Sequence, residues 1–263
     1  MALVIPMMAS AQLLEVESIE RVAKVAAFTP TGDYLLLTNT SNQGLQRMNL
    51  ATQQVTKITS ADGAGYNVKI AQDDKQIVYR EVTLDVAKSR VSNIVRHSFD
   101  GGHVKWWLRG QHSLESMTVE AERPSFSVKD RQLMMTVNGE TTVFSPNGQQ
   151  HSYHWASLSP NGKKVSYYIS EVGCFVCDID GKNIQFIGHN CLAPVWYNDN
   201  IIVGCDAKDN GEVVLESVIV AYGLDGQKQV LTNGEQIAVF PQAANGKIAY
   251  STSEGEIYIM NVK

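Results

Sequence analysis

Short apolar runs alternate with polar turns along most of the chain, and the spacing of amphipathic helices is almost absent. One pattern recurs: an apolar residue, a polar turn rich in Pro, Asp, Asn or Gly, and then an apolar strand. Its six copies are 28–35, 70–77, 126–133, 158–165, 196–201 and 243–248. They are spaced by about 43 residues on average, the length of one four-stranded propeller blade. The chain is therefore predicted to be an all-β, six-bladed β-propeller. An irregular pair of β-sandwiches is the alternative, which the even spacing disfavours.

Tight-turn dipeptides mark the outer half of several blades. Asn-Gly or Asp-Gly occurs at 100–101, 147–148, 180–181 and 225–226, and each is predicted to join a third strand to a fourth. The last copy lacks a fourth strand because the chain ends shortly after 256–262. A spare strand at 12–18 precedes the first copy. We expect this N-terminal strand to complete the last blade, since ring closure pairs two otherwise exposed sheet edges.

Two segments carry a resemblance to a known family. Ser159-Pro160-Asn161-Gly162-Lys163 and the stretch 124–130 resemble the SPDGK-type repeat of TolB-like propellers, which also occurs in the propeller domains of prolyl oligopeptidase and dipeptidyl peptidase IV relatives. The resemblance covers nearly the whole chain and implies the six-bladed fold, but this fold hosts many functions. Blades two and three depart from the pattern, with Asp73-Asp74 and Lys129-Asp130 where Asn/Asp-Gly is usual.

The N-terminus has the pattern of a processed export signal. Residues 1–8 are nearly all apolar, and the small residues Ala9 and Ala11 suit a signal peptidase. We interpret 1–11 as the remnant of a signal peptide and 12–263 as a single propeller domain, in a periplasmic or extracellular protein. A plain apolar N-terminal strand is the alternative. No run approaches the length of a membrane-spanning helix.

Charge and cysteine content narrow the function classes. The formal net charge is -5 with scattered Lys and Arg, which disfavours a nucleic-acid binder. Export would permit disulfides among the four cysteines, and the sequence does not choose a pairing. Those cysteines are Cys174, Cys177, Cys191 and Cys205. Cys174 and Cys177 lie three apart in a predicted strand and should point to opposite faces, which disfavours a redox or zinc site.

Strand order predicts which loops share a face. Successive strands are antiparallel, so the second-to-third loops and the blade-to-blade crossovers lie together. The long segments 83–90 and 109–123 fall on that face, around blades two and three. Long loops on a rigid scaffold often carry function, so this surface, with Arg109 and His112, is the candidate binding face. An insertion without function is the alternative.

The start of each innermost strand is predicted to line the central channel on the same face. The candidates there are Tyr66, Asn67, Arg123, His154, Trp155, Asn190 and Phe240. Arg123 could pair with a carboxylate or phosphate, while Trp155 and Tyr66 could stack on a sugar or a peptide side chain. Alternatively, the aromatic rings pack between blades and Arg123 is solvated.

No catalytic motif accompanies the fold signal. The sequence lacks Gly-x-Ser-x-Gly, His-Glu-x-x-His, P-loop and dinucleotide motifs. We therefore expect no catalytic residue, no bound metal and no cofactor, although the sequence leaves catalysis open. The favoured hypothesis is a non-catalytic exported propeller that binds a protein or peptide. The alternative is a carbohydrate-active or small-ligand propeller resembling oligogalacturonate lyase, with Arg123, His154 and Trp155 at the channel mouth.

Overall fold

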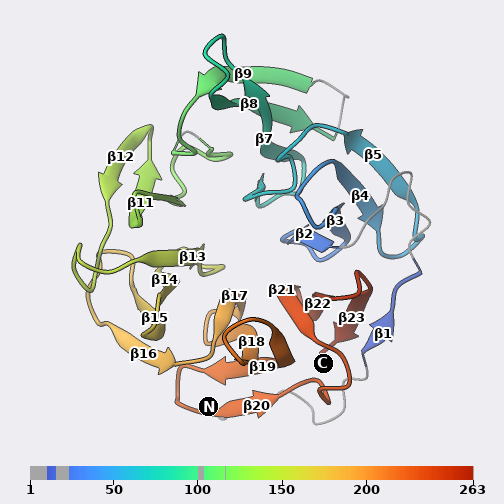
Figure 1. Ribbon diagram of the computed structural model, residues 1–263, viewed down its shortest axis with the longest axis vertical. Coiled ribbons are helices and arrows are strands. Elements are labelled where there is room, and N and C mark those ends of the chain that lie inside the picture. Colours follow the sequence, from blue (N-terminus) through green and yellow to red (C-terminus); the bar gives the residue numbers. More distant parts are fainter. Residues whose placement is uncertain (1–10, 16–23, 100–103, 116, 263) are drawn as a thin grey trace.

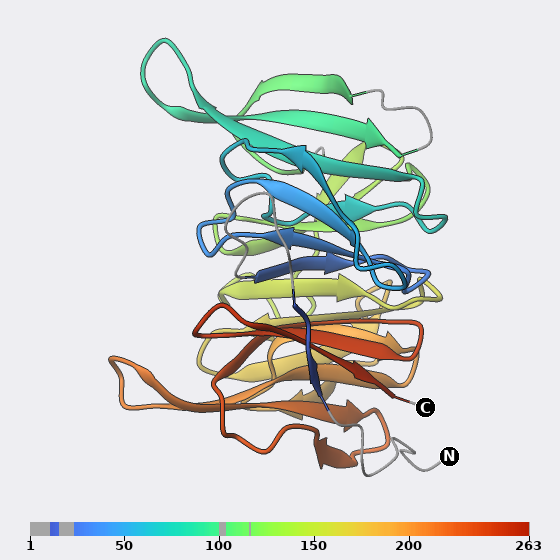
Figure 2. The ribbon, with the colours of Figure 1, turned by 90° about the vertical axis from the view of Figure 1, so that its right-hand side faces the viewer.

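Six antiparallel sheets stand radially around a central opening (Figure 1). The structure is a computed structural model that describes residues 11–15, 24–99, 104–115 and 117–262. The side view shows a flat disc of stacked sheets (Figure 2). The predicted six-bladed, all-β propeller is confirmed. The described ranges contain no helix with the length and apolarity needed to cross a membrane.

Each sheet is one blade, with its strands ordered from the central axis to the rim. Blade one holds β2 (Lys24–Phe28), β3 (Tyr34–Thr38), β4 (Leu45–Asn49) and β5 (Val55–Thr59). Blade two holds β6 (Lys69–Ile70), β7 (Gln76–Leu84), β8 (Arg90–Ser98) and β9 (Val104–Gln111). Blade three holds β10 (Ser125–Lys129), β11 (Gln132–Val137) and β12 (Glu140–Val143). Blade four holds β13 (Tyr153–Leu158), β14 (Lys164–Ile169), β15 (Gly173–Asp178) and β16 (Gln185–Gly188). Blade five holds β17 (Leu192–Asn198), β18 (Ile201–Asp209), β19 (Val214–Gly223) and β20 (Lys228–Val230). Blade six holds β21 (Ala238–Ala244), β22 (Lys247–Thr252), β23 (Ile257–Asn261) and β1 (Gln12–Leu13).

The N-terminal strand closes the ring as predicted. β1 pairs with β23 in antiparallel register, with Leu13 opposite Tyr258. The backbone N–H of Leu14 donates to the carbonyl oxygen of Ile257 at 2.8 Å, and the Leu14 side chain is buried. Residues from both ends of the chain therefore belong to one sheet, and β1 covers the edge of β23 that would otherwise be exposed. The predicted signal-peptide remnant lies outside the described residues, apart from Ala11.

The core consists of apolar layers between neighbouring blades. Because side chains alternate along a strand, each blade contributes to the layers on both of its sides. Cys174 packs with Val220 of blade five, whereas Cys177 packs with Tyr153 of its own blade in the layer next to blade three. The expected opposite orientation of these cysteines is confirmed. All four cysteines are buried free thiols.

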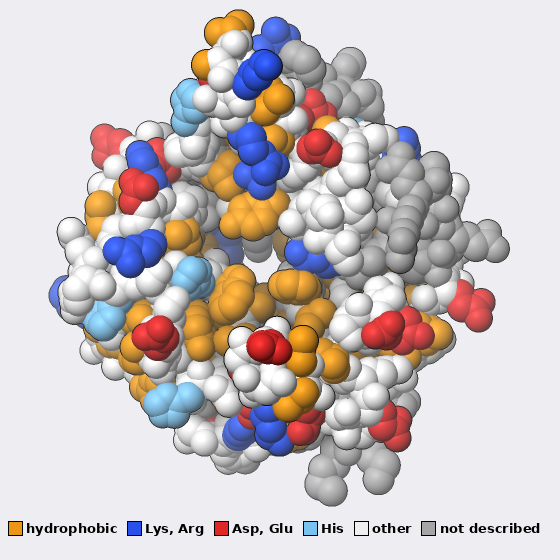
Figure 3. All heavy atoms as spheres, viewed as in Figure 1, with side chains coloured by type: hydrophobic (Ala, Val, Ile, Leu, Met, Phe, Trp, Pro, Cys, Tyr) orange, Lys and Arg blue, Asp and Glu red, His pale blue; other side chains and the backbone are white. Residues whose placement is uncertain are grey.

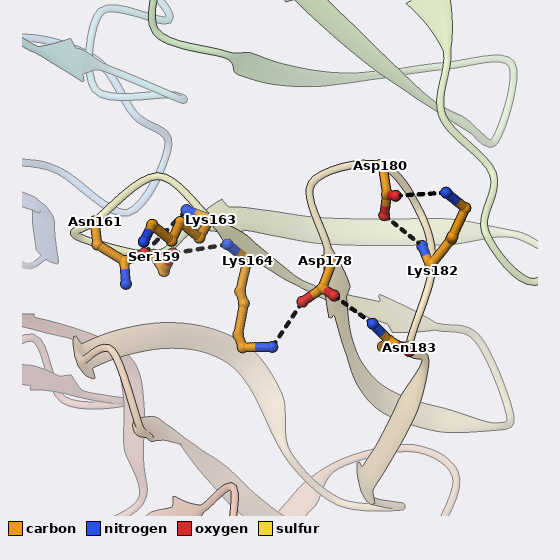
Figure 4. A network of polar contacts seen from close by, with 8 residues as sticks. All are labelled: Ser159, Asn161, Lys163, Lys164, Asp178, Asp180, Lys182 and Asn183. Atoms are coloured by element: carbon orange, nitrogen blue, oxygen red, sulfur yellow. Dashed lines mark hydrogen bonds and ion pairs between the residues drawn. The ribbon is translucent and has the colours of Figure 1, made fainter.

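The Ser-Pro-Asn-Gly-Lys segment forms the turn between β13 and β14 (Figure 4). Asn161 Oδ1 accepts hydrogen bonds from Ser159 Oγ and the Lys163 backbone N–H at 2.8 and 2.9 Å. Ser159 Oγ in turn accepts from the Lys164 backbone N–H at 2.9 Å. Lys164 Nζ then reaches the Asp178 carboxylate at 2.7 Å on the adjacent strand. The repeat is thus a self-bonded turn, in which short polar side chains satisfy the turn's backbone.

The two faces of the disc differ in loop length. We call "lower" the face that carries the first-to-second and third-to-fourth turns; there, Leu224 N–H donates to Asn200 O and joins two such turns of blade five. The opposite, upper face carries the hairpins β7–β8 and β18–β19, which project well beyond the disc (Figure 2). The first of these lies in the predicted segment 83–90. The second, whose tip is at 209–214, was not predicted.

Blade three has only three strands, and its innermost strand runs in the reverse direction. Just before β10, Arg123 bonds to the lower turn of blade four, at Ser159 O. Just after β10, Arg131 O accepts a hydrogen bond from Tyr153 N–H, at the upper start of β13. β10 therefore rises from the lower to the upper face, whereas β13 descends. The prediction that 126–133 is an ordinary copy of the repeat is therefore wrong, because its first strand runs opposite to the first strand of blade four.

This reversal has two further consequences. The turn between β11 and β12 is Asn138-Gly139, and the predicted Asn147-Gly148 turn lies instead in the crossover to β13. The missing descending strand is replaced by irregular chain after β9, and Met117 in that chain is fully buried against Val78 and Ile94 of blade two. The segment 109–123, predicted as a long binding loop, thus has its middle in the core.

Candidate functional site

A cavity of about 550 Å³ opens at the upper mouth of the channel. Residues from all six blades line it, and three of its aromatic side chains are substantially exposed. These are Tyr66 at 46%, Trp155 at 45% and Phe240 at 39%. Figure 3 shows hydrophobic and basic side chains gathered around the central opening on this face. The structure therefore brings four of the predicted channel residues together at one mouth, these three and Asn67.

Irregular backbone aims these side chains at the mouth. Trp155, Ala193 and Phe240 have φ angles of 48°, 48° and 52°, and each lies within a β-bulge at the start of its innermost strand. Asn67 has a φ of 58° just before β6. A bulge adds one residue and redirects a side chain. Bulky residues seldom adopt positive φ, and such strain clusters at functional sites. Because a β-bulge with a residue of positive φ occurs in three blades at the upper mouth, this mouth is the candidate site.

Two cations stack on the aromatic rings of the mouth. The Arg80 guanidinium carbon lies 4.6 Å from the centroid of Tyr66, and Lys24 Nζ lies 4.2 Å from the centroid of Phe240. Burial lowers the pKa of Lys24 and of Arg80 below the usual values. No Asp or Glu is among the described residues that line the cavity. The mouth is thus apolar and electropositive, which suits an amphipathic segment that also carries negative charge.

His154 lies beside the mouth and contacts Trp155. Its Nε2 is 2.8 Å from Ser170 Oγ, and its ring centroid is 5.8 Å from that of Trp155. Trp155 also packs on Tyr168, with ring centroids 5.4 Å apart. The half-buried histidine therefore packs against the tryptophan that lines the mouth.

The remaining predicted site residues lie elsewhere. Arg123 bonds through Nη2 to Ser159 O and Pro160 O, both at 3.1 Å, on the lower face. Arg109 is exposed in β9, the outer strand of blade two, and His112 is exposed just after it. Asn190 lies in a groove between blades four and five, where its carbonyl accepts from Tyr222 Oη. The expectation that Arg123 and Asn190 share a mouth with Trp155 is wrong, because β10 runs in reverse and the Asn190 backbone is bound at the blade junction.

The sequence pattern did not indicate Lys24 and Arg80, the two cations that stack on the aromatic rings. Lys24 could have been found, because it starts the innermost strand of blade one, the position the channel candidates occupy in other blades. Arg80 had no such signal, since it projects from the second strand of its blade.

Among the described residues, no group of three or more His, Cys, Asp or Glu lies close enough to hold a metal ion.

Comparison with solved structures returns other propellers. A TolB from Acinetobacter baumannii matches with a TM-score of 0.60 and 15% identity, over 82% of this chain and 55% of that one. A chain described as TolB from Agrobacterium tumefaciens matches with a TM-score of 0.60 and 15% identity, over 92% and 90% of the two chains. An oligogalacturonate lyase from Vibrio parahaemolyticus matches with a TM-score of 0.55 and 10% identity, over 90% and 76%.

These likenesses show the fold. No protein-family model matches the chain. No curated protein matches it either. The chain is a TolB-like six-bladed β-propeller in architecture. Because this fold hosts many functions, its function is inferred from the residues at the upper mouth.

Proposed function

We propose that this protein is a non-catalytic, exported propeller that binds a segment of a partner protein on its upper face. The observation that carries the proposal is the upper mouth, where Tyr66, Trp155 and Phe240 are exposed around a cavity and two cations stack on two of these rings. Exposed aromatic side chains supply large contact areas at low entropic cost and dominate many protein interfaces.

The two upper hairpins extend the same surface. Leu84 and Val86 are exposed on β7–β8, and Val213 and Leu215 are exposed on β18–β19. When a partner covers apolar side chains at projecting tips, their removal from water lowers the free energy of the complex. The hairpins belong to blades two and five, which stand on opposite sides of the ring (Figure 1). A partner segment seated in the mouth would therefore be contacted from both sides. The proposed surface thus involves blades two and five, whereas the sequence had pointed to blades two and three.

A pull-down from the native cell-envelope fraction tests this proposal. The wild-type chain should recover one reproducible partner, and the double variants Leu84→Ser/Val86→Ser and Val213→Ser/Leu215→Ser should weaken that recovery. Val230→Ser, on the exposed outer strand β20, is the matched control and should bind as the wild type does. Failure to recover any partner, or recovery unchanged in both double variants, would count against the proposal.

A carbohydrate or small-ligand function is the second candidate, favoured by the Trp155 ring with His154 beside it. An exposed indole is a common platform for a sugar ring, and the imidazole could bond to a hydroxyl or carboxylate. Arg123, part of the original hypothesis, lies at the opposite mouth and cannot join these two residues. A thermal shift with uronic-acid oligosaccharides, tested with and without a divalent ion, would support this candidate, and no shift across that panel would remove it.

Export is part of the proposal and rests on the N-terminal sequence pattern. Cleavage after Ala11 would leave Gln12 as the first residue and keep β1 intact for ring closure. Fractionation of the native cells and N-terminal sequencing of the mature protein test this point. A cytosolic protein that retains its first residues would contradict it.

A further inference from the structure

The channel continues below the mouth into a second cavity of about 270 Å³. Both cavities are lined by Val68, Phe126 and Ala156, so the two meet at the waist of the channel. The lower cavity combines apolar walls, such as Phe28 and Leu158, with several polar side chains. It is thus continuous with the upper cavity but has charged side chains of its own, namely Lys69, Glu120 and Arg123.

Lys69 supplies an uncompensated cation to this lower cavity. Its Nζ donates one hydrogen bond, to the carbonyl oxygen of Phe126 at 3.1 Å. An ammonium group has three donors, so two remain for a ligand. Lys69 is half-buried, and desolvation lowers the pKa of its amine to about 8. Among the described residues, no carboxylate forms an ion pair with Lys69, and a bound anion would offset the cost of burying its charge.

Other donors in the same cavity have spare capacity. Among the described residues, the side chains of Gln242 and Ser157 make no hydrogen bond within the protein, and both line the cavity. Arg123 also lines it, and its two hydrogen bonds both come from Nη2. The one acidic residue of the lining is Glu120, whose Oε1 accepts from Gln72 N–H at 3.1 Å. The cavity is therefore rich in donors and carries a positive balance.

We propose that the lower half of the channel binds a small organic acid, with its carboxylate on Lys69 Nζ and its apolar part against Phe28 and Leu158. The apolar walls favour an organic anion over inorganic phosphate, because phosphate would leave them uncovered. A volume of about 270 Å³ accommodates a short organic acid. This site goes beyond the proposed function, since it lies beneath the mouth and uses none of the residues assigned to the partner.

Calorimetric titration of the full chain with butyrate, succinate and inorganic phosphate tests the site. Butyrate or succinate should bind, and Lys69→Met should weaken that binding by about tenfold or more, as expected for loss of one charge-assisted contact. Lys75→Met is the matched control, because Lys75 is exposed on the lower turn of the same blade, and it should bind as the wild type does. The absence of binding of either organic acid, binding of phosphate alone, or equal binding by Lys69→Met would overturn the proposal.

A second measurement needs no variant. Acetylation of Lys69, mapped by mass spectrometry, should slow several-fold when butyrate is present, since a bound carboxylate both shields the amine and favours its protonated form. Labelling of Lys75 should not change. Protection of both lysines, or of neither, would contradict a local site. Because the hairpin variants leave this cavity intact, failure here is distinguishable from failure of partner binding at the upper face.

Discussion

Arg123 Nη2 donates a hydrogen bond to the carbonyl oxygen of Ser159, 3.1 Å away, and so joins blade three to blade four on the lower face. Each of the other blade junctions carries a polar contact as well. They are Thr31 N–H to Asp74, Gln72 N–H to Glu120, Asn161 N–H to Asp199, Tyr197 Oη to Val262 O, and Asn245 Nδ2 to Thr31 O. The ring is therefore closed twice, by the β1–β23 pairing in the last blade and by a circuit of hydrogen bonds between blades.

Arg123→Met should destabilise the fold without affecting partner binding. It would leave the carbonyls of Ser159 and Pro160 without this donor, at a cost of about 1–2 kcal/mol in the free energy of unfolding. Urea unfolding measures the change, and Lys163→Met, on the lower turn of blade four, is the control with little expected effect. Unchanged stability with lost partner binding would return Arg123 to the role of a ligand residue.

Glycine at the bulges should separate backbone strain from binding. Ala193→Gly removes the side chain that disfavours positive φ, and should stabilise the protein by about 0.5–1 kcal/mol while leaving binding unchanged. Phe240→Gly relieves similar strain but removes the ring on which Lys24 stacks, and should lose partner binding. Thermal unfolding and the pull-down measure the two effects. Equal binding by both variants would show that the Phe240 ring is not part of the binding surface.

Lys69→Met should stabilise the protein at neutral pH, and the gain should shrink at high pH. The pKa of Lys69 is lowered from 10.5 to about 8 by burial. The unfolded chain therefore binds more protons than the folded one between pH 8 and 10.5, so wild-type stability rises with pH in that window. Below pH 8 the full cost of the buried charge is present, about 1–3 kcal/mol. Urea unfolding of both proteins from pH 7 to pH 10.5 checks the trend, and a constant difference across that range would contradict it.

Ring closure should depend on Leu14 far more than on its neighbour. Leu14 is 8% exposed and packs in the apolar layer with Val25 and Ile257, whereas Leu13 is 44% exposed. Leu14→Ala should cost about 2–3 kcal/mol through lost burial and the cavity left behind, and Leu13→Ala well under 1 kcal/mol. Thermal and urea unfolding compare them. Similar small effects would mean that the N-terminal strand contributes little to closure.

Much of the architecture could be predicted from local features. Alternating apolar positions and Asn/Asp-Gly turns are properties of a few neighbouring residues, and these determined the number of blades, the closure near Leu13 and the opposite faces of Cys174 and Cys177. The positions of Tyr66, Trp155 and Phe240 followed as well, because they start innermost strands in blades that keep the regular order.

Tertiary structure alone decided the direction of the first strand of blade three and which residues surround each candidate site residue. Nothing in the local pattern of 124–133 shows whether its first strand rises or descends. That depends on the preceding chain, where Met117 is buried against blade two and the regular descending strand is absent. The same packing sends Arg123 to the lower face. The pairing of Arg80 with Tyr66 joins side chains from different strands. A strand's direction and its neighbours are set by burial of apolar surface contributed by distant parts of the chain, which no short window of sequence contains.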